Sequence, residues 1–389
     1  MGEVTLEMYN GQTPSRNNSK FWNDNIFWLT SGELNHGTIK NTIEKISKLG
    51  QKDKNLRLVK KGTFVIAITG LEAAGIRGNC AILGIDTTLN QSVMAIYPDP
   101  KKVTNEFLFN WYEKVGQHYG IIYTQGTKQQ SYNSNILNIL PISITPSLKE
   151  QRQINQILKK VNDFIDLQQR KLELLKEIKK GLLQKMFADK SNFPILRFEG
   201  FHAEWEQRKL GELYSYHNGK AHEQNQRSSG KYELINLNSI SVDGTLKSSG
   251  RYINHADEIL RQNDLVMILS DIAHGTLLGR VAIIPQDNKY VLNQRVALLR
   301  PISKSENSNF MAPLINNNQR YFHKMGIGTS QLNISKSTVI ESLWQIPKIK
   351  EQSVIGNFLQ NIDHIIALQH QRLSKLDEIK KSLLQQMFI

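Results

Sequence analysis

The chain contains two copies of one pattern, in which a globular segment is followed by a long amphipathic helix. Residues Lys149–Phe187 and Lys350–Phe388 both begin with KEQ, both end with LLQ-x-MF, and are identical at nearly half of their positions. Within the globular segments, Leu89-Asn90-Gln91 matches Leu292-Asn293-Gln294. Self-similarity at a fixed offset is the sequence signature of a repeated architecture. We therefore predict a tandem duplication with the order globule, helix, globule, helix.

The two helical segments each carry one apolar stripe at helical spacing and one charged face. At 1.5 Å per residue each helix would be about 60 Å long, which exceeds the face of a compact globule. The simplest partner for each stripe is its own copy, so we predict an antiparallel coiled coil. The alternative is that each helix packs only on its own globule. The residues that we expect to pair the helices are Ile154, Val161, Leu175, Leu182, Ile355, Ile362, Leu376 and Leu383.

The globular segments contain short apolar runs bounded by glycine or asparagine, such as Phe64–Ile68 and Leu265–Leu269. Runs of this kind are typical of β-strands, and the intervening segments leave room for helices. The fold class that follows is α/β (α+β) domains in tandem duplication, each followed by a long helix. We place the domains at 1–146 and 191–347 and the helices at 147–190 and 348–389.

The charge of the chain suggests a polyanionic partner. Its 49 Lys and Arg against 35 Asp and Glu leave a formal net charge of +14, which favours nucleic acid, although net charge alone is weak support. The one cysteine, Cys80, lies in an apolar run and is expected in the core. The N-terminal residues lack the pattern of a signal peptide and no run is long enough for a membrane helix, so we expect a soluble cytoplasmic protein.

The sequence offers no candidate catalytic residue and no metal site. No GxxxxGK[ST] loop is present, and GLEAAGIRG at Gly70 lacks the lysine that would reach a phosphate. There is no HExxH pair and no Asn-Pro-Pro or Asp-Pro-Pro motif, and PDPKK at Pro98 is better explained as a surface turn. We expect a chain that is not itself an enzyme.

Polar and basic loops occupy matching places in both copies and are the candidate DNA-reading elements. Arginine and lysine donate to guanine, while glutamine and asparagine pair with adenine, so these loops carry the groups that direct readout requires. The candidates in the first copy are Arg16, Asn18, Lys20, Arg77, Gln91, Lys128, Gln129 and Gln130. Those in the second copy are Lys220, Arg227, Arg280, Gln294, Arg295, Ser330 and Gln331.

At these motifs the chain resembles the specificity subunit of type I restriction-modification systems over nearly its full length. The resemblance is carried by FPILRFEGFHAEWEQRKLGEL at Phe193–Leu213 and by GQTPSRNNSKFWNDNIFWLTSGEL near the start. It is also carried by the ending of each copy, in which a GT turn around Gly126-Thr127 or Gly328-Thr329 leads to a proline-containing strand, KEQ and a long helix.

The resemblance implies that each recognition domain reads one half of a bipartite, gapped DNA site and that the helices fix the spacer. It further implies two modification (methyltransferase) subunits and the restriction (motor-nuclease) subunits as partners. S-adenosylmethionine, ATP and Mg²⁺ would then be cofactors of those partners, with none in this chain. One departure is that the first copy has no counterpart of LRFEGFHAEWEQRK, for which a late translation start or trimming would account.

Two other functions stay open at this point. A self-sufficient DNA-modifying enzyme would need a methyl-donor or metal site, which the sequence does not offer. A coiled-coil scaffold with incidental basic charge would bind DNA without sequence preference and without strong salt dependence, whereas a DNA reader loses affinity steeply with salt.

Overall fold

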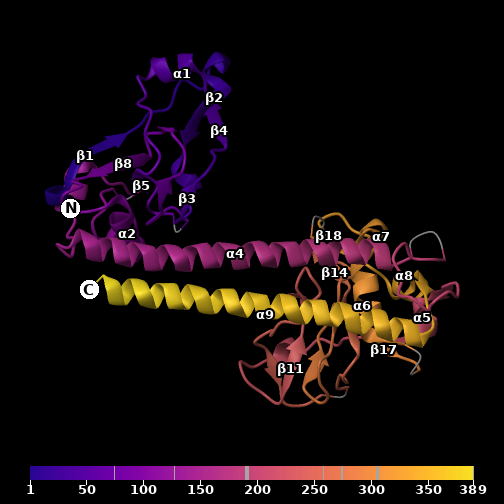
Figure 1. The fold of residues 1–389 in the computed structure, drawn as a ribbon. Coiled ribbons are helices and arrows are strands. Elements are labelled where there is room, and N and C mark those ends of the chain that lie inside the picture. Colours follow the sequence, from indigo (N-terminus) through magenta and orange to yellow (C-terminus); the bar gives the residue numbers. More distant parts are fainter. Residues whose placement is uncertain are drawn as a thin grey trace. The chain divides into compact units, whose positions relative to one another are not determined.

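The computed structural model describes residues 1–73, 75–126, 128–188, 192–256, 258–272, 275–303 and 306–388. These residues form two compact units: unit 1, which comprises Met1–Arg170 and Gln371–Ile389, and unit 2, which comprises Lys171–His370. Each unit contains one globular α/β segment and part of both long helices (Figure 1). Thr127, used to align the copies, and the predicted domain boundary at 190–191 lie outside the described residues.

Unit 1 is built on a five-stranded sheet with the order β1-β8-β5-β6-β3. Its central strand β5 (Phe64–Ala67) is buried along its whole length, because β8 and β6 flank it and α2 (Asn105–Ile122) packs against it. This is the apolar run in which we expected a strand. The other strands are β1 (Thr5–Asn10), β3 (Thr38–Ile39), β6 (Cys80–Leu83) and β8 (Val93–Pro98).

A second sheet of unit 1 has the order β4-β2-β7. β2 (Trp22–Leu29) runs parallel to β7 (Thr88–Leu89) and antiparallel to β4 (Glu44–Ile46). Trp28 lies edge-on to Trp22, with 5.1 Å between ring centroids, and forms a small separate core with Ile46. The remaining short helices are η1 (Gly2–Val4), η2 (Ser19–Phe21), η3 (Ser31–Glu33), α1 (Lys48–Asp53) and α3 (Ser134–Ile139).

Unit 2 repeats the two main sheets of this plan. Its four-stranded sheet has the order β10-β17-β13-β15, which corresponds to β1-β8-β5-β6, and its sheet β12-β11-β16 again contains one parallel pair, β11 with β16. The predicted tandem duplication is therefore confirmed. The strands are β9 (Glu206–Lys209), β10 (Tyr214–Asn218), β11 (Tyr232–Ile235), β12 (Tyr252–Ile253), β13 (Leu265–Ile268), β14 (Ser270–Ile272), β15 (Val281–Ile283), β16 (Tyr290–Leu292), β17 (Val296–Pro301), β18 (Gln331–Asn333) and β19 (Leu343–Ile346). The short helices are α5 (Leu210–Leu213), η4 (Glu223–Asn225), η5 (Leu237–Ser239), α6 (Ser308–Asn317), α7 (Gln319–Met325) and α8 (Lys336–Ile340).

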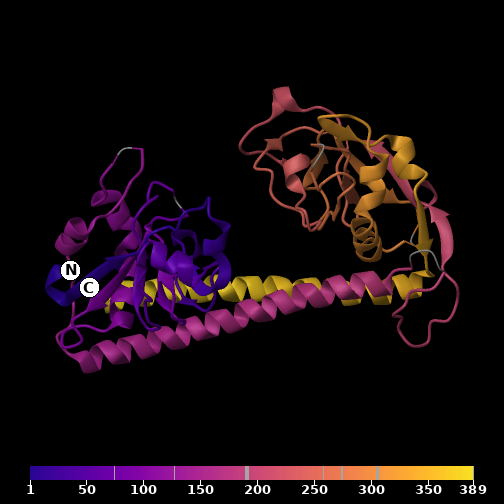
Figure 2. The same cartoon turned by 90° about the horizontal axis from the view of Figure 1, so that it is seen from above.

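Two long helices, α4 (Leu148–Met186) and α9 (Ile349–Met387), pair antiparallel within each unit. In unit 1 the start of α4 shares a core with the end of α9, through Leu158 and Leu384. In unit 2 the end of α4 shares a core with the start of α9, through Met186 and Leu359. The Lys179 ammonium also pairs there with the Asp363 carboxylate. The two helices lie side by side in Figures 1 and 2.

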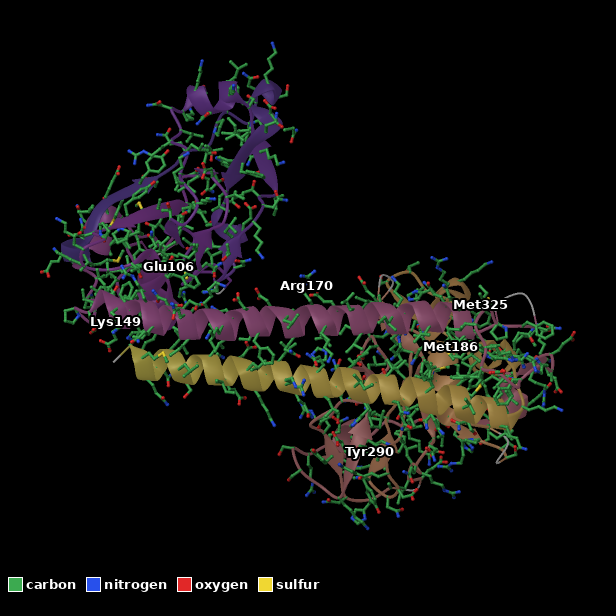
Figure 3. The ribbon with its side chains drawn as sticks, in the orientation of Figure 1. Glu106, Lys149, Arg170, Met186, Tyr290 and Met325 are labelled. Atoms are coloured by element: carbon green, nitrogen blue, oxygen red, sulfur yellow. The ribbon has the colours of Figure 1, made fainter. Side chains whose placement is uncertain are left out.

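Buried and half-buried positions recur every seven residues along both helices, as in a coiled coil. The a positions are Gln151, Leu158, Ile165, Leu172, Lys179 and Met186 in α4, and Gln352, Leu359, Ile366, Leu373, Lys380 and Met387 in α9. Ile154, Val161, Leu175 and Leu182 fall on the d positions of α4, and Ile355, Ile362, Leu376 and Leu383 on those of α9; all eight are buried or half-buried. Figure 3 draws the side chains between the helices and labels Met186 near the end of α4.

The KEQ glutamines fasten each globule to its helix. Gln151 accepts a hydrogen bond from the N–H of Thr104, the N-cap of α2, at 3.1 Å, and donates to the Lys102 carbonyl at 2.8 Å. Gln352 accepts from the N–H of Asn307, the N-cap of α6, at 3.0 Å, and donates to the Pro347 carbonyl at 2.9 Å. Both glutamines are buried, so the same short motif makes the same joint in each unit.

The two units differ where the first copy lacks the Phe193–Lys209 segment. In unit 2, β9 pairs with β19 over four residues, and Trp205 packs on Phe310 with 5.7 Å between ring centroids. In unit 1 the counterpart of β19, residues 142–145, forms no strand. In the part of the chain that the structure describes, no helix is long and apolar enough to cross a membrane.

Candidate nucleic-acid interface

The loops Leu89–Ser92 and Leu292–Arg295, which carry the candidates Gln91, Gln294 and Arg295, are held by equivalent backbone hydrogen bonds in the two units. The Asn90 N–H donates to the Leu29 carbonyl and the Asn293 N–H donates to the Ile235 carbonyl, each at 2.9 Å. The backbone of a glycine packs closely against the backbone of each loop. A Cβ on Gly219 would lie 1.9 Å from the Asn293 carbonyl oxygen, and Gly11 is as close to Leu89, so neither glycine could carry a side chain.

Among the candidates of unit 1, Arg16 is bound by side chains of its own unit. Its guanidinium donates two hydrogen bonds to the Glu44 carboxylate and lies 3.8 Å from the Trp22 ring centroid. This pairing raises the pKa of Arg16 and lowers that of Glu44. Asn18 caps η2 by accepting from the Lys20 N–H at 3.2 Å, while Lys20 itself is exposed.

The other candidates of unit 1 are either hydrogen-bonded within the unit or exposed. Arg77 donates to the Leu71 carbonyl at 2.8 Å, so its guanidinium is hydrogen-bonded to its own loop. Gln91 accepts from the Thr13 hydroxyl. Lys128 and Gln129 are exposed, and Gln130 has a buried Oε1 without a partner among the described residues.

Unit 2 shows the same division. Arg280 donates to the Asn316 carbonyl at 3.0 Å, and burial lowers its pKa. Gln331 donates to the Ser270 hydroxyl at 2.8 Å, while Ser330 is exposed. Arg227 is bridged through its backbone to Tyr252.

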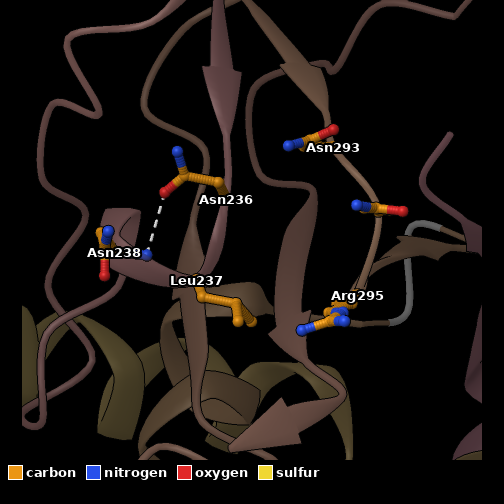
Figure 4. A pocket seen from close by; sticks show the side chains of 6 residues that line it. Asn236, Leu237, Asn238, Asn293 and Arg295 are labelled. Atoms are coloured by element: carbon orange, nitrogen blue, oxygen red, sulfur yellow. Dashed lines mark hydrogen bonds between the residues drawn. The ribbon is translucent and has the colours of Figure 1, made fainter. Parts of the chain in front are cut away.

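The remaining three candidates of unit 2 meet at one place. Lys220 forms a backbone bridge with Asn293, and Gln294 and Arg295 line a pocket of 270 Å³ beside it. Asn236, Leu237, Asn238 and Asn293 complete its lining (Figure 4). Two predicted residues of one loop therefore line the pocket, and Lys220 is joined to that loop by its backbone bridge to Asn293.

A larger cleft of 1400 Å³ lies in unit 1, between residues 32–43, α2 and the long helices. Its lining contains charged side chains of both signs: the cations Lys40, Arg152, Lys159 and Lys380 and the carboxylates Glu33, Glu106, Asp163, Asp166 and Asp377. A phosphate backbone selects a surface of one sign, so this cleft has no charge preference for DNA.

The sequence did not reveal a buried ionic cluster beside this cleft. The Glu113 carboxylate accepts from the Lys380 ammonium at 2.9 Å, and His36 Nδ1 lies 3.9 Å from the same carboxylate and 3.7 Å from Cys80 Sγ. Cys80 is fully buried, as expected, and burial raises the pKa of its thiol. The four residues are far apart in sequence, so no local spacing could have brought them together. Among the described residues, no group of three or more such side chains could hold a metal ion.

Each unit also exposes the same three apolar positions on its helices. In unit 1 they are Phe164 and Leu167 of α4 and Ile379 of α9, which are 44%, 59% and 51% exposed. In unit 2 they are Ile365 and Leu368 of α9 and Ile178 of α4, which are 46%, 50% and 55% exposed. They occupy neighbouring c and g positions of the heptad, apart from the a and d seam. Each unit therefore presents a second apolar stripe that its own residues leave uncovered.

Comparison with known proteins places these features in one family. The family model described as "Type I restriction modification DNA specificity domain" matches residues 2–177 and again residues 202–378. Among curated proteins, the MjaVIII specificity subunit of a type I restriction enzyme from Methanocaldococcus jannaschii is 21% identical over 307 residues, which cover 75% of this chain and 72% of that protein. The MjaIX specificity subunit from the same organism is 24% identical over 223 residues, 55% of this chain and 50% of that protein.

Two solved structures share the fold. The S subunit of a type I restriction-modification system from M. genitalium superimposes with a TM-score of 0.65 at 14% identity, and the match covers 100% of this chain and 94% of that chain. A chain from a study of complex assembly and conformational transition in the type I restriction-modification system has a TM-score of 0.60 at 16% identity, with 100% and 96% coverage.

Proposed function

Since the chain belongs to the type I restriction-modification specificity family, we propose that it selects the DNA target of such a complex by binding a bipartite, gapped double-stranded site. Unit 1 reads one half-site and unit 2 reads the other. The long helices set the number of unread base pairs between them. The chain itself supplies no catalytic residue.

The observation that carries this proposal is that both units hold an equivalent loop in the same backbone framework. Leu89–Ser92 and Leu292–Arg295 follow equivalent parallel strand pairs and lie over equivalent glycines, Gly11 and Gly219. The two loops share the sequence Leu-Asn-Gln and differ at the fourth position, which is Ser92 in one and Arg295 in the other. One framework with a changed side chain suits two half-sites of different sequence, because base edges are distinguished by side-chain donors and acceptors. The net charge of +14 supplies the non-specific attraction to phosphates.

The exposed stripes support the proposed partners. A helix with a second apolar stripe fits a helical partner that covers it, and the repetition of the stripe in both units suits two copies of one partner. We assign these surfaces to two modification (methyltransferase) subunits, which in turn recruit the restriction (motor-nuclease) subunits. S-adenosylmethionine, ATP and Mg²⁺ are then bound by those subunits.

The test is to sequence adenine methylation in cells that carry the modification and restriction genes, with and without the gene for this chain. We expect one gapped motif that is fully methylated only when the gene is present. Exchanging the loops of unit 2 should change one half of the motif and leave the other half and the spacer intact. An uninterrupted motif, or methylation that does not depend on this gene, would contradict the proposal.

A further inference from the structure

The main sheet of unit 1 ends in a strand whose outer edge is unpaired. β3 is the last strand in the order β1-β8-β5-β6-β3 and runs parallel to β6. On the inner side of β3, the Gly37 carbonyl accepts from the Ile82 N–H at 2.9 Å. The Ile39 carbonyl accepts from the Gly84 N–H at 2.8 Å. Thr38 lies between these two residues of β3, so its own N–H and C=O point away from the sheet. Among the described residues neither group has a hydrogen-bond partner, and Thr38 is exposed.

Unit 2 closes the corresponding edge with its own residues. The strand that corresponds to β6 is β15, and the Asn316 side chain accepts from the Val281 N–H of β15 and donates to the Val281 carbonyl, both at 2.9 Å. The amide therefore takes the place of a neighbouring strand. A turn from Ser241 to Thr245 covers this amide, since Gly244 of the turn packs against it. An open sheet edge is a template for a foreign strand, and proteins normally cover it, so the two units differ at this edge.

The unpaired edge of β3 lies on the wall of the 1400 Å³ cleft of unit 1. Residues 32–43 form this wall, and residues of α2, α4 and α9 form the rest. In Figure 1, β3 lies on the side of the globule that faces α4. The volume exceeds the roughly 300–1,000 Å³ of a small-molecule pocket. The lining combines charges of both signs with amide side chains such as Asn162 and apolar ones such as Phe109, which suits a polypeptide.

The cleft lies next to the surface that we assign to a modification subunit. Asp163 and Asp166 of α4 line the cleft. Phe164 and Leu167, the exposed positions of the second apolar stripe, lie beside them in the sequence of the same helix. A protein that covers the stripe of unit 1 is therefore adjacent to the cleft. A segment of that protein that enters the cleft as an extended chain meets the free N–H and C=O of Thr38.

We propose that the modification subunit at unit 1 adds an extended segment to β3, as a sixth strand of the five-stranded sheet. A carbonyl of the segment accepts from the Thr38 N–H, and an N–H of the segment donates to the Thr38 carbonyl. In this mode of binding the main-chain hydrogen bonds supply affinity and alternate side chains supply specificity. Because Asn316 closes the corresponding edge of unit 2, the second modification subunit is bound without this strand. The inference rests on the proposed function and adds a partner site to one unit.

Hydrogen–deuterium exchange of the full chain, alone and with its modification subunits, tests the added strand directly. The Thr38 amide has no acceptor in the chain alone and should exchange freely. In the complex it should exchange slower by roughly tenfold or more, because an amide in a closed strand pair is protected. A third sample contains the chain and target DNA without modification subunits. Protection of Thr38 in that sample would overturn the proposal, because the occupant would then be nucleic acid.

A proline variant tests the same hydrogen bond by affinity. Thr38→Pro removes only the outward N–H, and an edge strand tolerates proline where the nitrogen faces outward. It should weaken binding of the modification subunit at unit 1 by roughly 5- to 150-fold, because a buried acceptor of the segment loses its donor. The affinity is measured in combination with Leu368→Glu, which we expect to leave only the site of unit 1. In combination with Leu167→Glu, which leaves the site of unit 2, Thr38→Pro should have no effect.

The matched control places a proline in the corresponding turn of unit 2. Val242 is 56% exposed and is the second residue of the turn that the Gly244 N–H closes onto the Ser241 carbonyl at 2.9 Å. Proline is favoured at this position of a β-turn, and the Val242 N–H has no acceptor among the described residues. Val242→Pro should therefore leave the affinity of both sites unchanged.

The outcomes separate this inference from the function on which it rests. Unchanged exchange of the Thr38 amide in the full complex would overturn the added strand. Equal affinities of Thr38→Pro and Val242→Pro at unit 1 would also overturn it, as would an equal loss at both units. Each of these results leaves a gapped methylation motif intact. Absence of that motif would instead overturn the proposed function.

Discussion

Glu351 and Glu150 occupy the same position of the repeated KEQ motif but have different surroundings. Glu351 is 3% exposed, and its carboxylate accepts from the Arg197 guanidinium at 2.7 and 2.8 Å. Trp205 Nε1 donates to the same carboxylate at 3.4 Å. Glu150 is exposed, because the segment that supplies Arg197 and Trp205 has no counterpart in unit 1.

This difference predicts unequal effects of one substitution. Glu351→Ala should lower the free energy of unfolding by about 1–3 kcal/mol, because it leaves the half-buried Arg197 guanidinium and the buried Trp205 N–H without their acceptor. Glu150→Ala should change it by less than about 0.5 kcal/mol, as for an ordinary surface residue. Denaturant unfolding of both variants measures this, and equal losses would show that the Arg197 pair does not anchor the segment.

Glu113 gives unit 1 a pH dependence of known sign. Burial raises the pKa of its carboxyl above the ordinary value of 4.5, although the nearby Lys380 ammonium acts in the opposite direction. A carboxyl with a raised folded-state pKa stabilises the fold most when protonated, and this contribution is lost as pH rises through that pKa. The unfolding free energy of the wild type minus that of Glu113→Gln should therefore increase as pH falls from neutral toward 4.5.

Glu44 provides a control of opposite sign for this measurement. Arg16 lowers the pKa of the Glu44 carboxyl, so its contribution is present above the unfolded-state pKa and is lost as pH falls. The same difference taken with Glu44→Gln should decrease on acidification. Parallel curves for the two variants would show that the surroundings of Glu113 are misassigned.

The long helices carry two different apolar stripes. The a and d seam pairs α4 with α9, while the c and g positions expose Phe164 and Leu167 in unit 1 and their counterparts Ile365 and Leu368 in unit 2. The seam residues are buried or half-buried between α4 and α9. The residues of the second stripe are left exposed by their own unit, so we expect a partner molecule to cover them.

Charges placed on the second stripe should separate the two proposed partner sites. Leu167→Glu should remove one modification subunit from the complex, Leu368→Glu should remove one, and the double variant should remove both, because burying a carboxylate in an apolar contact is costly. Native mass spectrometry counts the subunits. Arg170→Glu and His364→Glu, at f positions of the same helices, are the matched controls. Full occupancy in the double variant would place the partners elsewhere.

Elements that depend on local pattern were predicted correctly from the sequence. The long helices follow from the spacing of their apolar residues, and β5 and β13 follow from short apolar runs, since neighbouring residues decide both. The repeat located the loops around Asn90 and Asn293. It could not show that Arg16 pairs with Glu44, because Arg16 lies in the loop before η2 and Glu44 lies in β4.

At the scale of the whole molecule, duplication explains why the units share so much. The strand orders of the main sheets match, and the KEQ glutamines make equivalent hydrogen bonds. Each unit also contains part of α4 and part of α9. Each unit therefore combines its own globule and the start of its own long helix with the end of the long helix of the other repeat. Neither globule with its following helix alone would contain all of the contacts that a unit needs.

Both ends of the chain lie in unit 1 (Figure 2). Met1 and Phe388 belong to the same hydrophobic core; the Met1 ammonium donates to the Leu140 carbonyl, and the Lys114 ammonium donates to the Phe388 carbonyl. The two ends of the chain therefore meet within one unit. A gene rearranged to fuse these ends through a short linker, and to begin the chain between residues 188 and 192 instead, would encode the same contacts in a different order. Recombination at the new ends would then exchange one globular segment for another without altering the rest of the chain.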